Sequence, residues 1–206
     1  KPLFFPGGDI GRLAVAGTVN DLSVMGASPL ALSCAMVIQE GFSTEELHTI
    51  MRSLNSTARS AGVRIVTGDT KVVEKGAADG LFINTSGIGR RSPHLDHNMA
   101  EVRRSRGFKW EWPNDSGVGD KDVIIASGPI GNHGVALLSF REGYGFDTVV
   151  KSDAAPLNHL IAEALKVGGV TSMKDPTRGG LANLLNEWAE KSSVGIRVRE
   201  EDIPMD

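Results

Sequence analysis

The segment 17–27, GTVNDLSVMGA, places Asn20 and Asp21 inside an otherwise apolar stretch. Around them the apolar side chains recur at roughly helical spacing, at Leu13, Ala16, Val19, Leu22 and Val24. This spacing predicts a buried helix. A carboxylate on such a helix is costly to bury unless another group pairs with it. Asp21 therefore constrains the fold, because some other part of the chain has to supply that partner.

A second carboxylate follows the apolar run 63–66, which is typical of a short strand. After this run come Thr67, Gly68, Asp69, Thr70 and Lys71, which we expect to form an acidic turn. Asp21 and Asp69, if brought together, would make an oxygen-rich site for a hard cation such as Mg²⁺, the usual companion of nucleotide phosphates. The alternative is that the two aspartates cap a helix and a turn without binding a metal.

Helices and strands alternate along both halves of the chain. In the first half we expect strands at 30–39, 63–66 and 81–89, a helix through Asp21 and a capped helix from Ser43 to Gly62. In the second half we expect strands at 122–126 and 170–173, and helices at 135–140, 154–167 and 181–190. This alternation predicts an α/β fold. The polar stretch 90–120, with its prolines and glycines, predicts a linker or insertion between the halves.

Glycine-rich turns precede three of the expected helices, at 6–11, 127–134 and 175–180. Such turns can offer free N–H groups to an anion at a helix N-terminus. Neither a G-x-G-x-x-G fingerprint nor a G-x-x-x-x-G-K-[ST] loop occurs, so a nucleotide would have to bind by another route. Asp175 again follows an expected strand, and this recurrence favours an anion-plus-metal site over separate structural turns. His133 is interpreted either as a residue that orients substrate or moves a proton, or as a capping or packing residue.

The composition argues against several classes of function. The 206 residues have a formal net charge of -3, which does not favour nucleic acid, and the basic and aromatic patch at 103–112 is interpreted as surface. No apolar run approaches the roughly 20 residues that span a bilayer, and no signal peptide is visible, so we expect a cytoplasmic protein without a membrane segment. Cys34, the single cysteine, lies in an apolar run, and we interpret it as a core residue rather than a reactive thiol. The spacing of His94 and His97 could suit two metal ligands, but no other His or Cys lies nearby, so we interpret them as part of a solvated loop.

Five segments, in this order, resemble the HypE family of hydrogenase maturation factors: FFPGGDIGRLAVAGTVNDLSVMGA, IVTGDTKVVEKG, INTSGIGR, SGPIGNHGVALLS and DPTRGGLANLLNE. That family belongs to the superfamily of aminoimidazole ribonucleotide synthetase, selenophosphate synthetase and thiamine-monophosphate kinase. The resemblance covers nearly the whole chain apart from 94–118, and it implies a PurM-like two-domain fold of the α/β (α+β) class. The N-terminal domain, 1–92, would bind ATP and form a β-barrel homodimer. A linker or insertion would occupy 93–119, and 120–206 would form a C-terminal α/β domain.

The resemblance implies a carbamoyl dehydratase that uses ATP and Mg²⁺. Such an enzyme dehydrates a cysteine-bound thiocarboxamide to a thiocyanate and supplies the cyano group to the iron of [NiFe]-hydrogenase, with the carbamoyltransferase HypF and the HypC–HypD complex as partners. Phosphorylation would turn the amide oxygen into a good leaving group. By matching motifs, Asp21 and Asp69 would bind Mg²⁺ and ATP, and Lys71 and His133 would be catalytic. The other nucleotide-binding residues would be Asn20, Gly68, Thr70, Gly131, Asn132, Asp175, Thr177, Arg178, Gly179 and Gly180.

The chain departs from the family pattern at both ends. It stops at Asp206 without the family's cysteine-bearing tail, and an acidic segment expected before Lys1 is missing. We therefore expect a fragment of a longer protein that does not complete the reaction on itself. Two alternatives remain open. One is a small-molecule kinase or synthetase of the same superfamily, acting on selenide or thiamine monophosphate, and the other is a nucleotide-binding scaffold without turnover.

Overall fold

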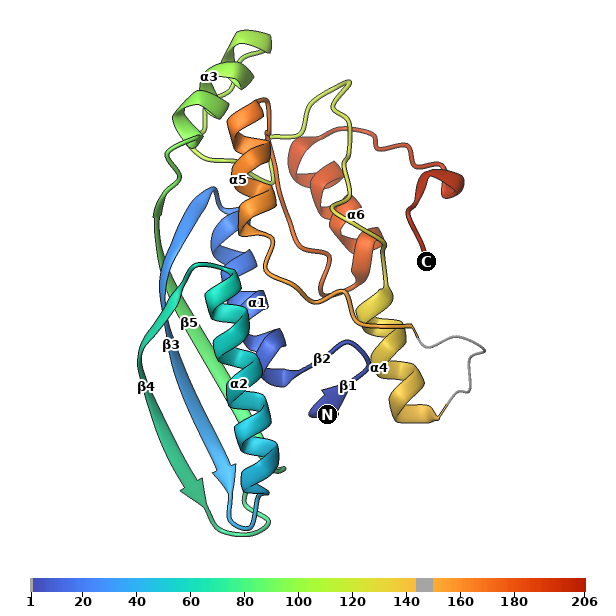
Figure 1. The fold of residues 1–206 in the computed structure, drawn as a ribbon. Helices are drawn as coiled ribbons and strands as arrows, with labels where there is room; N and C mark the ends of the chain where they lie inside the picture. The colour runs from blue at the N-terminus through green and yellow to red at the C-terminus, as the bar shows by residue number, and fades with distance from the viewer. Residues whose placement is uncertain (1, 144–149) are drawn as a thin grey trace.

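The computed structural model describes residues 2–143 and 150–206 and confirms the mixed α/β class. The first half contains a three-stranded sheet of β3 (Ala27–Gln39), β4 (Arg64–Val73) and β5 (Leu81–Arg91), in the order β4-β3-β5. β4 runs parallel to β3 and is connected to it through α2 (Thr44–Ser60), whereas β5 is antiparallel to β3. Helices α1 (Ile10–Val24) and α2 cover one face of the sheet, and the other face is open (Figure 1).

The chain enters α1 through a short hairpin of β1 (Phe4–Phe5) and β2 (Gly8–Asp9). Asp9 caps the helix, because its Oδ1 accepts hydrogen bonds from the N–H groups of Gly11 at 2.8 Å and Arg12 at 3.0 Å. The glycine-rich turn at 6–11 therefore uses these two amides internally and does not offer them to an anion.

Helix α2 begins and ends where its sequence predicts. Ser43 Oγ accepts a hydrogen bond from the Glu46 N–H at 3.3 Å, which is the expected N-terminal cap. Beyond the last turn, Gly62 has a φ of 70°, a left-handed conformation that glycine adopts without steric cost.

The main core fills the space between the sheet and the two helices. Its buried members are Val15, Val19, Leu32, Cys34, Leu54, Ala58, Ala61 and Val63. The prediction that Cys34 is a core residue is confirmed, since its side chain is buried in this cluster.

The second half contributes α3 (Leu95–Ser105), α4 (Asn132–Glu142), α5 (Asn158–Val167), α6 (Gly180–Ser192) and a short 3-10 helix (Glu200–Asp202). Helix α3 lies inside the stretch predicted to be a linker, and His97 lies on this helix rather than in a loop. The helix forms because its apolar side chains pack on α5, in a core of Leu95, Met99, Val102 and Leu165. Within residues 2–143 and 150–206, no helix combines the length and hydrophobicity needed to cross a bilayer.

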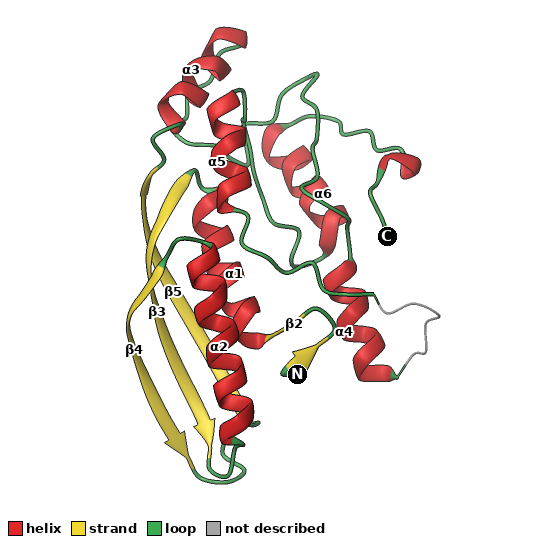
Figure 2. Cartoon of the chain, viewed as in Figure 1, coloured by secondary structure: helices red, strands yellow, loops and turns green. Residues whose placement is uncertain are grey.

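Two predicted strands in the second half are wrong. Residues 122–126 and 170–173 are irregular, and Figure 2 shows them as loops. In the first of these segments Val123 is 83% exposed and Ile125 is 88% exposed. A strand is stable only when its backbone groups pair with a neighbour, and neither segment has such a partner in the part of the chain that the structure describes.

Candidate functional site

Helix α1 carries Asn20 to the junction with the second half of the chain. The Asn20 side chain binds the segment that leads into α5. Its Nδ2 donates to the carbonyl of Ala155 at 3.0 Å, and its Oδ1 accepts from the N–H of Leu157 at 2.7 Å. Arg12 supports the same segment, because its Nε donates to the carbonyl of Ala154 at 2.6 Å. The contacts of Asn20 are therefore those of a residue that joins the two halves, and its contact with a nucleotide stays a prediction.

Asp21 does not lie on the buried face of α1. Its side chain is exposed, since the buried positions of the helix are Gly11, Val15, Ala16, Val19 and Ser23. The pKa of the Asp21 carboxyl is raised above its ordinary value of 3.8. The larger cause is partial burial, and the second is the negative charge of Asp175. The expectation of a buried carboxylate was wrong. The charge that acts on Asp21 comes from a second carboxylate in the other half of the chain.

Asp175 begins the loop that leads into α6. Its Oδ2 accepts a hydrogen bond from Thr177 Oγ1, and both residues are exposed, as is Arg178. Gly179 precedes the helix with a φ of 74°, and Gly180 follows with a φ of 61°. The N-cap residue Gly179 makes no side-chain capping bond. Because glycine has no side chain, Gly179 and Gly180 do not cover the partly positive N-terminal end of α6. Asp175 lies a few residues before this end in the sequence.

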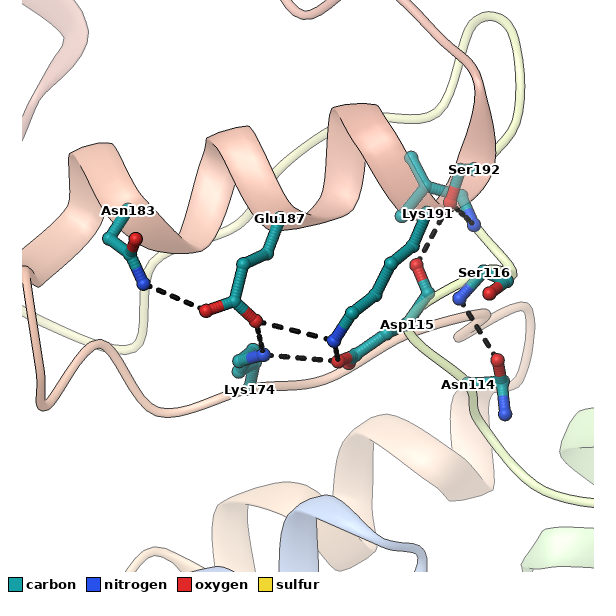
Figure 3. Close-up of polar contacts among 9 residues, drawn as sticks. Asn114, Asp115, Ser116, Lys174, Asn183, Glu187, Lys191 and Ser192 are labelled. Carbon is teal, nitrogen blue, oxygen red and sulfur yellow. Dashed lines mark hydrogen bonds and ion pairs between the residues drawn. The ribbon is translucent and has the colours of Figure 1, made fainter.

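A cluster of charged side chains fixes the residue before Asp175 (Figure 3). Lys174 Nζ donates to Asp115 Oδ2 at 3.0 Å and to Glu187 Oε2, and Lys191 Nζ donates to the same two oxygens at 2.8 and 3.3 Å. Burial alone would raise the pKa of Asp115, but the hydrogen bonds from Lys191 and Lys174 outweigh it and lower that pKa. The hydrogen bond to Glu187 is the main cause that raises the pKa of Lys174.

Sequence analysis missed this cluster because its members come from three separate segments. Only Glu187 and Lys191, four residues apart on α6, give a local signal for an ion pair. The contribution of Asp115 has no local signal, since it lies in the stretch that the resemblance to HypE does not cover.

The predicted acidic turn around Asp69 is a strand. β4 continues to Val73 because it pairs along β3, with Gly68 opposite Cys34 and Asp69 opposite Ala35. Residues paired across the two strands point to the same face of the sheet, and Cys34 points into the core. Gly68 therefore faces the helices, and Asp69 faces the open side of the sheet. Thr70, which donates its N–H to Asp69 Oδ1 at 2.8 Å, and Lys71 are both exposed.

Of the predicted acidic residues, Asp175, and not Asp69, is the one whose charge raises the pKa of Asp21, after burial. In a single chain the sheet lies between Asp69 and α1, because α1 packs on the helix-covered face. Across the described ranges, no three side chains of the His, Cys, Asp and Glu types are grouped so as to hold a metal ion. The role of Asp69 as a metal ligand stays a prediction.

The residues at the start of α4 make contacts typical of packing. Gly131 has a φ of 93°, and the buried Asn132 donates from Nδ2 to Asp206 Oδ2 at 2.7 Å. The His133 ring places Nδ1 2.9 Å from Ser152 Oγ and lies edge-on to Phe5, with 5.2 Å between ring centroids. These contacts join α4 to the N-terminal hairpin, as the packing interpretation of His133 expects. Proton transfer by His133 stays a prediction.

Two cavities have linings that include none of the predicted site residues. One, of about 210 Å³, lies between the start of β3 and α5, and its polar lining comes from Ser28, Ser92, Asn158 and His159. The other, of about 290 Å³, lies between the start of α1 and β5. The chemistry of the junction, rather than the position of a cavity, therefore indicates the candidate site.

The fold and the junction define a class of protein. The family model described as AIR synthase related protein, N-terminal domain, matches residues 1–91, and the corresponding C-terminal domain model matches residues 119–206. The chain is an AIR synthase related protein, with both domain models represented. Within that class it belongs to the HypE family of hydrogenase maturation proteins, as its similarity to named relatives over its whole length shows.

Three relatives illustrate this similarity. The carbamoyl dehydratase HypE of Rhizobium leguminosarum bv. viciae is 48% identical over 207 residues, which cover 100% of this chain and 55% of the relative. The crystal structure of a HypE–HypF complex matches with a TM-score of 0.88 at 47% identity, covering 100% of this chain and 63% of the other. The crystal structure of HypE in complex with ATP matches with a TM-score of 0.88 at 44% identity, covering 100% and 57%. The chain therefore spans somewhat more than half the length of these relatives.

Proposed function

We propose that this chain forms the nucleotide-binding part of an ATP-dependent carbamoyl dehydratase. The complete protein would dehydrate a cysteine-bound thiocarboxamide to a thiocyanate and so supply the cyanide ligands of the [NiFe]-hydrogenase iron centre. The name of the Rhizobium relative supports the activity, and the HypE–ATP complex supports the nucleotide. The observation that carries the proposal is the similarity of the chain over its whole length to HypE, including HypE in complex with ATP, and the charge of Asp175 that acts on Asp21 agrees with it.

The groups at this junction fit a nucleotide with a divalent cation. Carboxylate oxygens are hard donors of the kind that Mg²⁺ prefers, and two like charges that face each other become favourable once a cation lies between them. The glycine-lined N-terminus of α6 suits a phosphate. We assign Asp21 and Asp175 to hold Mg²⁺, and the backbone of Gly179 and Gly180 to contact phosphate. When bound, Mg-ATP would supply the phosphoryl group that activates the amide oxygen for elimination.

In this proposal, Asp69 and Lys71 lie at the interface of a homodimer. The open face of the sheet carries large apolar side chains, with Phe82 56% exposed and Ile88 65% exposed. Exposed apolar patches of this kind mark surfaces that bind another protein. We infer that two copies pack these faces together into a β-barrel, with Asp69 and Lys71 of each copy on the same face of the sheet and available to the shared interface.

The partners and location belong to the same proposal. The HypE–HypF complex supports the carbamoyltransferase HypF as the partner that loads the cysteine. The HypC–HypD iron-centre complex would receive the product, and the reaction would take place in the cytoplasm.

Equilibrium binding of Mg-ATP to the 206-residue chain tests the site. Replacing Asp21 or Asp175 with Asn should weaken binding about tenfold or more, because each replacement removes a charged oxygen donor. Asp96→Asn is the matched control, since Asp96 pairs with Arg91 on the exposed surface. Equal affinities in all four proteins would contradict the proposed site.

Turnover by the longer protein that contains this chain separates the remaining alternatives. ATP consumption that depends on the carbamoylated cysteine supports the dehydratase. Consumption that depends on selenide or thiamine monophosphate favours the small-molecule kinase, and binding without any consumption favours the scaffold.

A further inference from the structure

The segment 114–118 lies in the stretch between the two family domains, yet it is bound firmly to the second half of the chain. The Asn114 N–H donates to the carbonyl of Thr171 at 3.0 Å. On the opposite side, Ser192 at the end of α6 accepts a hydrogen bond from the Val118 N–H at 3.2 Å and donates to the carbonyl of Asp115 at 2.9 Å. The segment therefore connects the chain that leads to Asp175 with the C-terminal end of α6.

The charged cluster lies at the centre of this connection, as Figure 3 shows. The side chains of Lys174 and Asp115 are only 25% and 30% exposed, so their ion pair is partly shielded from water. Each of the two lysines contacts both carboxylates, and Glu187 is itself held by Asn183 Nδ2 at 2.8 Å. A network in which each side chain serves two contacts fixes its members better than an isolated surface pair does.

This arrangement has a consequence for the residue that follows Lys174. The Lys174 ammonium binds Asp115 and Glu187, and the Asp175 carboxylate accepts a hydrogen bond from Thr177. If Lys174 were released, its flexible stem would allow the ammonium to reach the neighbouring carboxylate. Such a contact would neutralise that carboxylate and change the path of the loop 175–180.

We propose that Asp115, Lys174, Glu187 and Lys191 are positioning residues, which fix the path of the loop 175–180 at the start of α6. The positional part of this proposal, that the four residues fix the loop, is argued from the contacts of the cluster. The functional part, that the fixed loop matters for nucleotide binding, rests on the proposed function.

Backbone dynamics measured by NMR without nucleotide test the positional part. In Lys174→Gln, the order parameters of the backbone N–H groups in the loop 175–180 should fall from a rigid value of about 0.85 to below about 0.6. The conservative variant Lys174→Arg keeps the charge and should restore the rigid value. Glu163→Gln is the control, because it removes a solvent-exposed ion pair with Lys166 on α5 and should leave the loop unchanged. Unchanged order in Lys174→Gln would overturn the inference.

Affinity for Mg-ATP tests the functional part in the same variants. We expect Lys174→Gln and Asp115→Ala to bind about tenfold more weakly, Lys174→Arg to bind within about threefold of the original chain, and the midpoint of thermal unfolding to shift by no more than about 4 °C. A disordered loop with undiminished Mg-ATP affinity would overturn the functional part. Failure of the original chain to bind Mg-ATP would refute the proposed function instead, and the order parameters would still decide the positional part.

Discussion

At the scale of single residues, the adjacent side chains of Asn20 and Asp21 have different surroundings and different expected roles. Asn20 is bonded through its amide to the backbone at Ala155 and Leu157, whereas Asp21 is exposed and its pKa is raised by partial burial and by the charge of Asp175. A substitution at Asn20 should therefore affect the stability of the fold, and one at Asp21 should affect a bound cation.

Replacing Asn20 with Ala is expected to lower the free energy of unfolding by about 1–3 kcal/mol, because a partly buried N–H and carbonyl lose their partners. Urea denaturation measures this change. Asn186→Ala is the control, since the exposed Asn186 bonds the carbonyl of Ala182 on its own helix, and it should change stability by less than about 0.5 kcal/mol. Equal effects at the two positions would refute the joining role of Asn20.

Gly68 is required by packing within the sheet. A Cβ at this position would collide with the backbone carbonyl of Cys34 on the neighbouring strand. We expect Gly68→Ala to destabilise the protein by about 1–3 kcal/mol. Gly17→Ala provides a control of opposite sign, because a Cβ at Gly17 in α1 meets nothing within 4 Å, and Ala is favoured over Gly in a helix by about 0.5–1 kcal/mol. Thermal unfolding of both variants checks the two signs.

At the scale of elements, the charged cluster joins the linker segment, the chain before Asp175 and α6. Its contribution to stability depends on pH in a direction that follows from Asp115. The pKa of this carboxyl in the fold lies below its ordinary value of 3.8, because the lysine hydrogen bonds outweigh the effect of burial. A carboxylate of this kind stabilises the fold fully above the unfolded pKa, and the stabilisation is lost as the pH falls through the folded pKa.

We therefore expect Asp115→Asn to be less stable than the original chain by about 0.5–1 kcal/mol at neutral pH, the range for a partly exposed pair. The difference should shrink as the pH falls below 3.8, the ordinary value for this carboxyl, and should vanish below the folded pKa. Urea titrations at a series of pH values measure this difference. Asp96→Asn should show a smaller effect, because Asp96 is 83% exposed. A difference that grows in acid would contradict the assignment.

At the scale of the whole molecule, the open face of the sheet is the surface on which the proposed homodimer depends. Phe82→Lys places a charge on this face and is expected to convert the dimer to a monomer, because a buried unpaired charge is strongly unfavourable. Phe140→Lys is the matched control, since Phe140 on α4 is also 56% exposed. Sedimentation equilibrium gives the mass of each variant. A dimer that survives Phe82→Lys would exclude this face as the interface.

Several features of the fold could be predicted from the sequence because their causes are local. The α2 cap at Ser43 and its end at Gly62, the helical span around Asn20 and the apolar run around Cys34 depend on neighbours in the chain. The mixed α/β class follows from the order of such elements. Local patterns failed for residues 122–126, because a strand also needs a partner. They also missed α3, whose apolar stripe lies among charged residues and is stabilised by packing on α5.

The sequence by itself therefore determined the class of the fold and the approximate position of most helices. The tertiary structure decided which charge acts on the carboxylate of Asp21. Strand register placed Asp69 on the far face of the sheet, and the charge that acts on Asp21 is that of Asp175 in the loop before α6. The physical reason is that capping and periodicity act over a few neighbouring residues, whereas the face of a strand and the approach of a loop are set by pairing and packing between distant segments.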